Sequence, residues 1–368
     1  MSPELEIQLV ASVVAAACAL PGVFLVLRRM AMMSDAISHT VLLGIVLAFF
    51  VVQQFGHPLL IIGAAGVGVL TVSLTEMLNR TKLVKEDAAV GLVFPALFSV
   101  AVILIGLFAR NVHLDQHMVF QGELAFTPFD RAIVFGLDLG PRTFVVMSVI
   151  LLLNLAFVTL FFKELKLATF DPELAEALGF RPILLHYGLM TLVSLTAVGA
   201  FDAVGSILVV ALMVVPPATA YLLTDKLSWM LGLSVLIGIA SAVLGYWLAS
   251  LLNSSIAGAM VTMTGVIFGL VFLLSPQRGM VALARRRMRQ RWEFAQTMLA
   301  IHLLNHEATP EAQVENRLDH LSEGLRWEEP FAQKVVGYAE RRGIVQEASG
   351  LLHLTDEGRR LAQQAMLR

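Results

Sequence analysis

Nine separate apolar stretches of membrane-spanning length constrain this chain more than any other feature. About 20 apolar residues in a helix cross the ~30 Å hydrocarbon core of a bilayer. The chain is 57% hydrophobic and 15% charged, which is too apolar for burial in one soluble core. The sequence therefore predicts an all-α polytopic membrane protein. The stretches lie at about 7–27, 34–53, 59–78, 88–109, 143–162, 183–201, 204–223, 229–251 and 256–275.

The break between the sixth and seventh stretches is short. It falls around Gly199–Gly205 and fits either a connection between two crossings or a re-entrant turn. The sequence accordingly predicts eight or nine transmembrane helices.

Basic residues gather in the loops that follow the first, third, fifth, seventh and ninth stretches. Because Lys and Arg are enriched in cytoplasmic loops, these loops are predicted to face the cytoplasm, with the N-terminus outside. Segment 110–142 carries three arginines on the other side and is the main exception. We expect a multi-pass membrane protein whose C-terminal part lies in the cytoplasm. The basic residues are Arg28, Arg29, Arg80, Lys82, Lys85, Lys163, Lys166, Arg181, Lys226, Arg278 and the arginines of 285–291.

The composition changes sharply after Ser275. From Arg285 to the end the chain has 13 Lys/Arg and 12 Asp/Glu and no spanning stretch. We expect a transmembrane domain over 1–277, a basic juxtamembrane linker over 278–291 and a small cytoplasmic domain over 292–368. The last domain is expected to be winged-helix-like, because helices precede a short β-ribbon. Its predicted elements are helices at about 292–305, 311–323 and 329–342, a ribbon at 344–354, and a helix from Thr355.

Asp35 and His39 are four residues apart at the start of the second stretch. On a helix they share one face. Ionisable groups inside a membrane helix are costly and usually face a partner or an ion path. A carboxylate and an imidazole suit divalent transition metals such as Mn²⁺, Fe²⁺ or Zn²⁺. A helix cap at Asp35 with a hydrogen-bonded His39 is the competing interpretation.

Two further groups of polar residues are weaker metal candidates. His113, Asp115, His117 and Glu123 lie within eleven positions on the predicted outer side, where they are placed to receive a metal or to form an ordinary solvated loop. Glu76 and Asp87 lie at the inner ends of two stretches. They fit either an exit path or simple helix capping next to basic residues.

A short amphipathic helix is predicted in the cytoplasmic loop after the fifth stretch. Asp171-Pro172 opens it, since proline suits the first helical position, and Gly179 closes it. Such a helix between two spans suits docking to an ATPase, although an interfacial helix without a partner has the same pattern. The candidate coupling residues are Asp171, Pro172, Glu173, Leu174, Ala175, Leu178 and Gly179.

Five collinear motifs between about residues 5 and 277 resemble the manganese/zinc/iron permease family of bacterial ABC importers. They are GVFLVLRRMAMMSDAISHTVLLGI, KEDAAVGLVFPALFSVAVIL, HLDQHMVFQGELAFTPFDR, FFKELKLATFDPELAEALGF and VGSILVVALMVVPPATAYLL.

The resemblance implies a permease subunit in a bacterial plasma (inner) membrane that moves an ion by alternating access. Its implied partners are cytoplasmic ATPase subunits, an extracellular or periplasmic metal-binding protein and a second permease subunit, within membrane lipids. It implies that Asp35 and His39 bind the transported ion and that 171–179 is the coupling helix. No tightly bound cofactor is expected. The chain lacks a G-x-x-x-x-G-K-[ST] phosphate loop, so ATP hydrolysis is expected on a separate chain and not here.

Residues 339–362 resemble the winged-helix end of metal-dependent repressors of the diphtheria-toxin-repressor type. Beyond the arginines of 285–291, however, the domain has 8 Lys/Arg against 12 Asp/Glu. A domain that reads DNA is normally basic on one face, so the charge argues against a nucleic-acid partner. The alternative function is a membrane-anchored metal-sensing regulator that uses this domain.

Overall fold

A computed structural model describes residues 2–54, 57–108, 122–134, 137–276, 278–307, 309–310 and 312–367. The chain divides into two compact units, Met1–Gly279 and Met280–Arg368. The functional division predicted at 277 and 291 stays a prediction.

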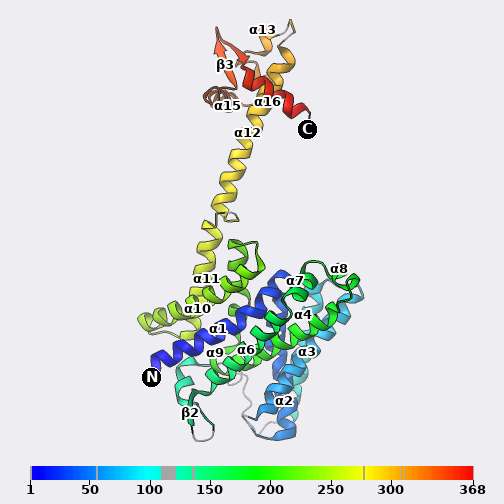
Figure 1. The fold of residues 1–368 in the computed structure, drawn as a ribbon, viewed down its shortest axis with the longest axis vertical. Coiled ribbons are helices and arrows are strands. Elements are labelled where there is room, and N and C mark those ends of the chain that lie inside the picture. Colours follow the sequence, from blue (N-terminus) through cyan, green and yellow to red (C-terminus); the bar gives the residue numbers. More distant parts are fainter. Residues whose placement is uncertain are drawn as a thin grey trace. The chain divides into compact units, whose positions relative to one another are not determined.

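The first unit is built almost entirely of helices (Figure 1). A short 3-10 helix η1 (Leu124–Phe129) and a two-stranded antiparallel ribbon, β1 (Arg131–Val134) and β2 (Leu137–Pro141), lie between α4 and α6. The α-helices are α1 (Pro3–Leu27), α2 (Ala31–Val52), α3 (Pro58–Arg80), α4 (Glu86–Phe108), α6 (Arg142–Leu160), α7 (Phe162–Phe170), α8 (Pro172–Ala177), α9 (Pro182–Leu223), α10 (Leu227–Leu252) and α11 (Ile256–Leu274).

Within the described residues, nine helices are long and apolar enough to cross a membrane. This confirms the predicted polytopic helical class. The sixth and seventh are the two parts of α9, Pro182–Phe201 and Ala203–Leu223. The backbone leaves the helical region at Gly205, with φ of 76° and ψ of 162°, which glycine tolerates because it has no Cβ. The predicted break is therefore present.

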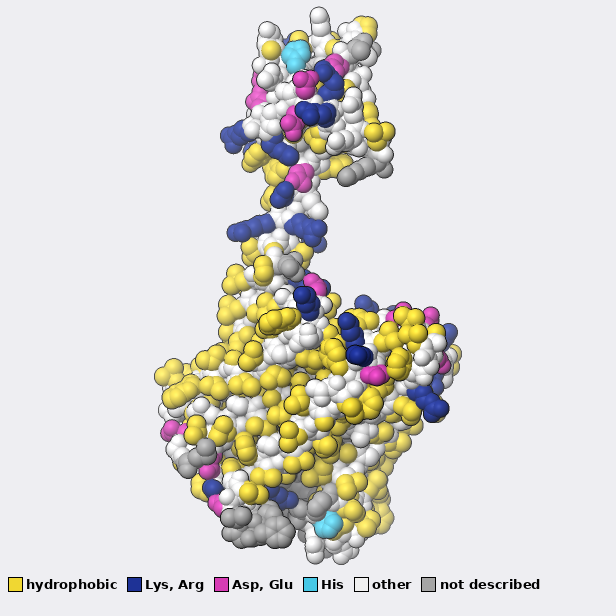
Figure 2. Space-filling model, in the orientation of Figure 1, with side chains coloured by type: hydrophobic (Ala, Val, Ile, Leu, Met, Phe, Trp, Pro, Cys, Tyr) yellow, Lys and Arg dark blue, Asp and Glu magenta, His cyan; other side chains and the backbone are white. Residues whose placement is uncertain are grey.

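Helix α1 forms the centre of this unit. It packs against α6, α9 and α10, and 78% of its most apolar window is buried, against 17% for α4 and for α11. On α6 the buried residues Met147, Ile150, Asn154 and Val158 follow a helical spacing and form one stripe. Many other apolar side chains of this unit are exposed, and apolar side chains cover much of the surface in Figure 2, as expected for helices surrounded by lipid.

Two small residues allow α2 and α3 to approach closely. A Cβ on Gly44 would collide with the backbone of Gly63, and a Cβ on Gly63 would lie 2.8 Å from the Gly44 carbonyl oxygen. On the same helix, a Cβ on Gly66 would meet no atom of another helix within 4 Å. Because small residues at membrane helix interfaces permit close backbone contact, Gly63 and not Gly66 sets the α2–α3 spacing.

The basic loops after the first, third and fifth spans meet at one end of this unit. Arg28, Arg29, Arg80 and Arg181 line the same cleft there. After the last span, Arg278 pairs with Asp225, which follows α9. Clustering of this kind agrees with the positive-inside pattern, and the cytoplasmic position of this end stays a prediction.

The second unit combines helices with one antiparallel hairpin. Ser349 and Gly350 both have positive φ, 57° and 77°, as a two-residue hairpin turn requires. Thr355 caps the last helix by accepting a hydrogen bond from the Gly358 amide at 3.1 Å. The elements are α12 (Met280–His306), α13 (Ala312–Glu315), α14 (Leu321–Gly324), α15 (Glu329–Arg341), β3 (Val345–Ala348), β4 (Leu351–Leu354) and α16 (Asp356–Met366).

Two of the helix boundaries expected in this unit were wrong. Helix α12 begins at Met280 and not near 292, because the arginine-rich run is itself a good helix former. The expected helix over 311–323 is instead the short helices α13 and α14. The order of helices, hairpin and final helix agrees with the expectation, and the winged-helix assignment stays a prediction.

Substituting Gly63 should destabilise the first unit more than substituting Gly66. In Gly63→Ala the new methyl group meets the Gly44 carbonyl and the Ala48 side chain, each at 2.8 Å, and overpacking costs about 1–3 kcal/mol. Gly66→Ala meets open space and gains helix propensity of up to about 1 kcal/mol. Thermal unfolding of both variants in detergent measures the difference. Equal unfolding temperatures would contradict the proposed packing.

Candidate functional site

Asp35 and His39 lie one turn apart on α2. The His39 Nε2 atom is 3.6 Å from Asp35 Oδ1, and each side chain is 42% exposed. The next residue, Thr40, is fully buried and accepts a hydrogen bond from Thr71 of α3 at 2.8 Å. That bond fixes how α2 is rotated against α3, and therefore which way this pair faces.

Aromatic side chains of α4 contact the His39 imidazole. The Phe94 ring is stacked with it at 5.5 Å between centroids, and the Phe98 ring meets it edge-on at 6.3 Å. Aromatic pairs prefer such stacked and edge-to-face arrangements. The two phenylalanines therefore restrict the imidazole and give the pair an apolar wall.

The pair offers one oxygen and one nitrogen ligand at close range. Two ligand atoms bonded to one ion at about 2.0–2.2 Å lie about 3.0–3.5 Å apart, so a small side-chain rotation brings Asp35 and His39 to that distance. Among the described residues, the pair belongs to no group of three or more His, Cys, Asp or Glu ligands. An ion here needs further ligands, such as water or backbone oxygen.

The predicted outer group is only partly described. His113, Asp115 and His117 lie outside the described residues, while Glu123 is exposed just before η1. Its neighbour Gly122 packs directly against α9, where a Cβ would collide with the Phe201 carbonyl and lie 2.5 Å from the Gly205 amide nitrogen. The segment that carries Glu123 is thereby held against the break in α9.

Glu76 is part of a polar network at the basic end of this unit. Its Oε1 atom is 2.6 Å from Arg80 Nη2, and its Oε2 atom is 3.9 Å from His186 Nε2 of α9. Arg28 Nη1 lies 3.4 Å from His186 Nδ1, and Arg28 Nε donates to Thr169 of α7 at 3.2 Å. The network therefore joins α3, α9, α7 and the end of α1.

Burial lowers the pKa of Arg28 to about 10, so its guanidinium remains charged at neutral pH. The network opens into a cleft of about 660 Å³ whose lining also includes Pro172, Glu173 and Glu176. Asp87, expected to act beside Glu76, is exposed at the start of α4 and is not among the residues that line this cleft.

The coupling candidate α8 has the predicted boundaries and caps. The Asp171 carboxylate accepts a hydrogen bond from the Leu174 amide at 2.9 Å, Pro172 takes the first position, and Gly179 ends the turn with φ of 85°. Ala175 is buried, whereas Leu174 and Leu178 are 46% and 61% exposed. This short helix and the residue that follows it thus present two leucines to the surface, and Glu173 and Glu176 are also exposed.

Sequence reasoning missed His186, Arg28 and Thr169 as members of the network. Arg28 was noted only for its charge, and His186 lies 158 positions from it in sequence. No local spacing connects residues so far apart. The sequence offered one indication of this network: basic residues occur in every second loop, and alternate loops lie at the same end of a helical membrane protein.

Removing the Asp171 cap should loosen α8. An N-cap carboxylate or amide side chain stabilises a helix by about 1 kcal/mol relative to alanine, so Asp171→Ala should speed amide exchange in α8 about fivefold. Asp171→Asn keeps a capping side chain and should keep the slower exchange rate. Hydrogen–deuterium exchange of peptides covering 171–179 provides the measurement. Equal rates in the two variants would show that the cap does not hold this helix.

The chain matches proteins of known families over most of its length. Residues 5–275 fit the ABC 3 transport family. The zinc transport system membrane protein TroD of Treponema pallidum is 49% identical over 359 residues, which cover 98% of each chain. The manganese transport system membrane protein MntD of Bacillus subtilis is 48% identical over 295 residues, which are 80% of this chain and all of that one.

Among solved structures, PsaBC from Streptococcus pneumoniae in complex with Fab is similar with a TM-score of 0.63. It is 29% identical, and the match covers 77% of this chain and 96% of the compared chain. The similarity to TroD extends into the second unit, because it leaves out only a few residues of either chain. The family predicted from the five motifs is confirmed: the chain belongs to the ABC 3 transport family.

Proposed function

We propose that this chain is the permease subunit of an ATP-driven importer of a divalent transition metal, with Mn²⁺ or Zn²⁺ as the transported ion. The observation that carries the proposal is the Asp35–His39 pair on α2, half exposed within a unit of apolar helices. The names of TroD and MntD, which specify zinc and manganese, support a metal substrate. They give no support to iron.

In the proposed mechanism, Asp35 and His39 take the ion from water during its passage. An ionised carboxylate and a neutral imidazole are the metal-binding forms, so protons compete with the ion and acid weakens capture. The Phe94 and Phe98 rings limit water on one side of His39. The ion is released when α2 changes its exposure from one face of the membrane to the other.

The driving force comes from partner ATPase subunits that dock on α8. The network of Arg28, Glu76 and His186 lines the same cleft as Pro172 and Glu173. Movement of α8 is therefore transmitted to α3 and α9, and through α3 to the neighbouring α2, which packs against it. A second permease subunit and an external metal-binding protein complete the proposed importer, and ATP hydrolysis takes place on the partner chains.

The alternative function, a membrane-anchored regulator, is not favoured. The family match covers residues 5–275, which is nearly the whole first unit. A protein that used the membrane only as an anchor has no need of nine apolar helices or of a polar pair among them. The second unit then modifies transport and does not replace it.

Replacing either member of the pair should abolish metal uptake. Asp35→Asn and His39→Gln keep the side-chain size but remove the charge or the imidazole, and losing one of two protein ligands costs at least about tenfold in affinity. Uptake of ⁵⁴Mn²⁺ or ⁶⁵Zn²⁺ by cells at limiting metal tests this. Leu47→Ala, at a similarly exposed position of α2, is the matched control. Normal uptake by both pair variants, with normal membrane insertion, would remove the proposed site.

Charging the exposed face of α8 should detach the ATPase. Leu174→Glu or Leu178→Glu replaces an exposed apolar side chain, and burying an unpaired charge in an interface costs several kcal/mol. Replacing Glu173 and Leu174 together should have the same result. ATPase copurification and metal uptake should both fall, while metal binding by the permease stays unchanged. Leu139→Glu on β2 is the control. Unchanged copurification would place the docking surface elsewhere.

A further inference from the structure

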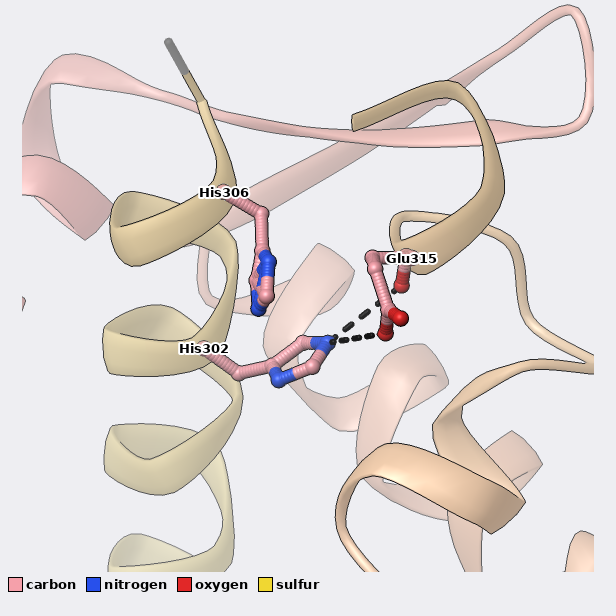
Figure 3. Close-up of side chains that lie close together, drawn as sticks. All are labelled: His302, His306 and Glu315. Atoms are coloured by element: carbon pink, nitrogen blue, oxygen red, sulfur yellow. Dashed lines mark hydrogen bonds and ion pairs between the residues drawn. The ribbon is translucent and has the colours of Figure 1, made fainter. Parts of the chain in front are cut away.

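Two imidazoles and a carboxylate lie together in the second unit (Figure 3). They belong to His302, His306 and Glu315, and one ligand atom from each lies within 4.8 Å of the other two. We propose that these three side chains form a binding site for one divalent transition-metal ion, separate from the Asp35–His39 pair.

Two elements of the second unit bring the three ligands together. His302 and His306 are one turn apart on α12, with ring centroids 4.7 Å apart. Glu315 is the last residue of α13, which packs against α12. Its Oε2 atom lies 3.9 Å from His302 Nε2, and its carbonyl oxygen lies 3.3 Å from the same nitrogen. The arrangement thus joins a residue pair at helical spacing to a ligand from another segment.

One atom of the cluster lacks the partner that a buried polar group normally has. Among the described residues, the His306 Nδ1 atom is shielded from solvent and has no hydrogen-bond partner. Leaving a buried acceptor or donor unpaired costs about 1–3 kcal/mol, so such atoms call for an explanation. An ion bound between the two rings and the carboxylate would satisfy this nitrogen.

A glycine packs directly against the cluster. A Cβ on Gly324, at the end of α14, would lie 2.9 Å from His302 Cε1 and 3.4 Å from Glu315 Oε2. Any larger residue at position 324 would push against the His302 ring, so this glycine helps to keep the two ligands in place.

The ligand set indicates the class of ion. In a tetrahedral zinc site, ligand atoms about 2.0–2.2 Å from the metal lie about 3.3–3.5 Å apart. The present separations, up to 4.8 Å, close to that value by rotation of flexible side chains. Two imidazoles and one carboxylate favour Zn²⁺, Fe²⁺ or Co²⁺ over Mg²⁺ and Ca²⁺, which prefer oxygen ligands only. Water fills the open coordination positions.

The site gives the second unit a chemical signal to respond to. It lies in the second unit, outside residues 5–275, the part that fits the transporter family. Bound metal would tie α13 to α12 and stabilise the metal-bound form of this unit. The inference goes beyond the proposed transport function and does not depend on it.

The test uses the full chain in detergent, stripped of metal, with Asp35→Asn and His39→Gln introduced so that the transport pair does not contribute. Equilibrium dialysis against Zn²⁺ and metal counting should find one ion fewer per chain after His302→Gln, His306→Gln or Glu315→Gln. If a variant still binds an ion at this site, its affinity for Zn²⁺ should be lower by at least about tenfold. His353→Gln, an exposed histidine of β4 in the same unit, should bind as much as the parent.

Tryptophan emission of each variant, compared with that of the parent, reports whether the second unit remains folded, because Trp292 and Trp327 both pack on Phe331, while Trp229 and Trp247 of the first unit contribute the same background to every variant. If a histidine variant changes this emission and is therefore not folded like the parent, the Glu315→Gln variant tests the site. Glutamine has nearly the same shape as glutamate, and the Glu315 side chain is partly exposed, so this substitution should not disturb the fold. Equal zinc content and affinity in the parent and in all folded cluster variants would overturn the proposal. Loss of uptake by Asp35 or His39 variants has no bearing on this result.

Discussion

Hydrogen bonding of the backbone within each helix is the constraint on which the first unit depends. In hydrocarbon an unpaired amide or carbonyl costs several kcal/mol, so the crossings are helical, and the backbone departs from the helix at Gly205 of α9, which is buried in protein. Because side chains no longer need to hide from water, exposed leucine, isoleucine and phenylalanine cover the outside. Which helix surfaces lie inside the unit then depends on how closely the helices pack together. Helix α1, which packs against α6, α9 and α10, lies at the centre.

Polar groups inside such a unit must find partners, and most of the buried serines and threonines bond to a carbonyl one turn back in their own helix, as Ser38 does to Ser34 and Ser234 to Met230. A few polar side chains bond between helices instead. The Asn154 amide of α6 donates to the Ala17 carbonyl of α1 at 3.0 Å and to Thr196 of α9 at 2.9 Å. These bonds tie three helices at one point, each worth about 0.6–2 kcal/mol in a membrane. Against that background the half-exposed Asp35–His39 pair stands out, because it is held in place while keeping open faces for a ligand.

The two candidate metal sites share one local arrangement of ligands but have different surroundings. Each has two potential ligands four residues apart on a helix, Asp35 with His39 and His302 with His306. On α2 the neighbours are the rings of α4, so the site is apolar and incomplete by itself. On α12 a third ligand, Glu315, comes from another element. An incomplete site suits transient passage of an ion, while a three-ligand site suits retention of one.

Several features of this protein follow from local sequence alone. The spans, the helix α8 with its Asp171 and Gly179 boundaries, and the Asp35–His39 pair all depend on length, periodicity and capping among residues close in the chain. What only the tertiary structure decided depends on contacts between distant segments. His186 meets Arg28 across 158 positions, Glu315 meets His302 from another helix, and Gly63 but not Gly66 lies at a helix interface. Helical periodicity fixes which residues share a face, but the packing of whole helices decides what that face meets.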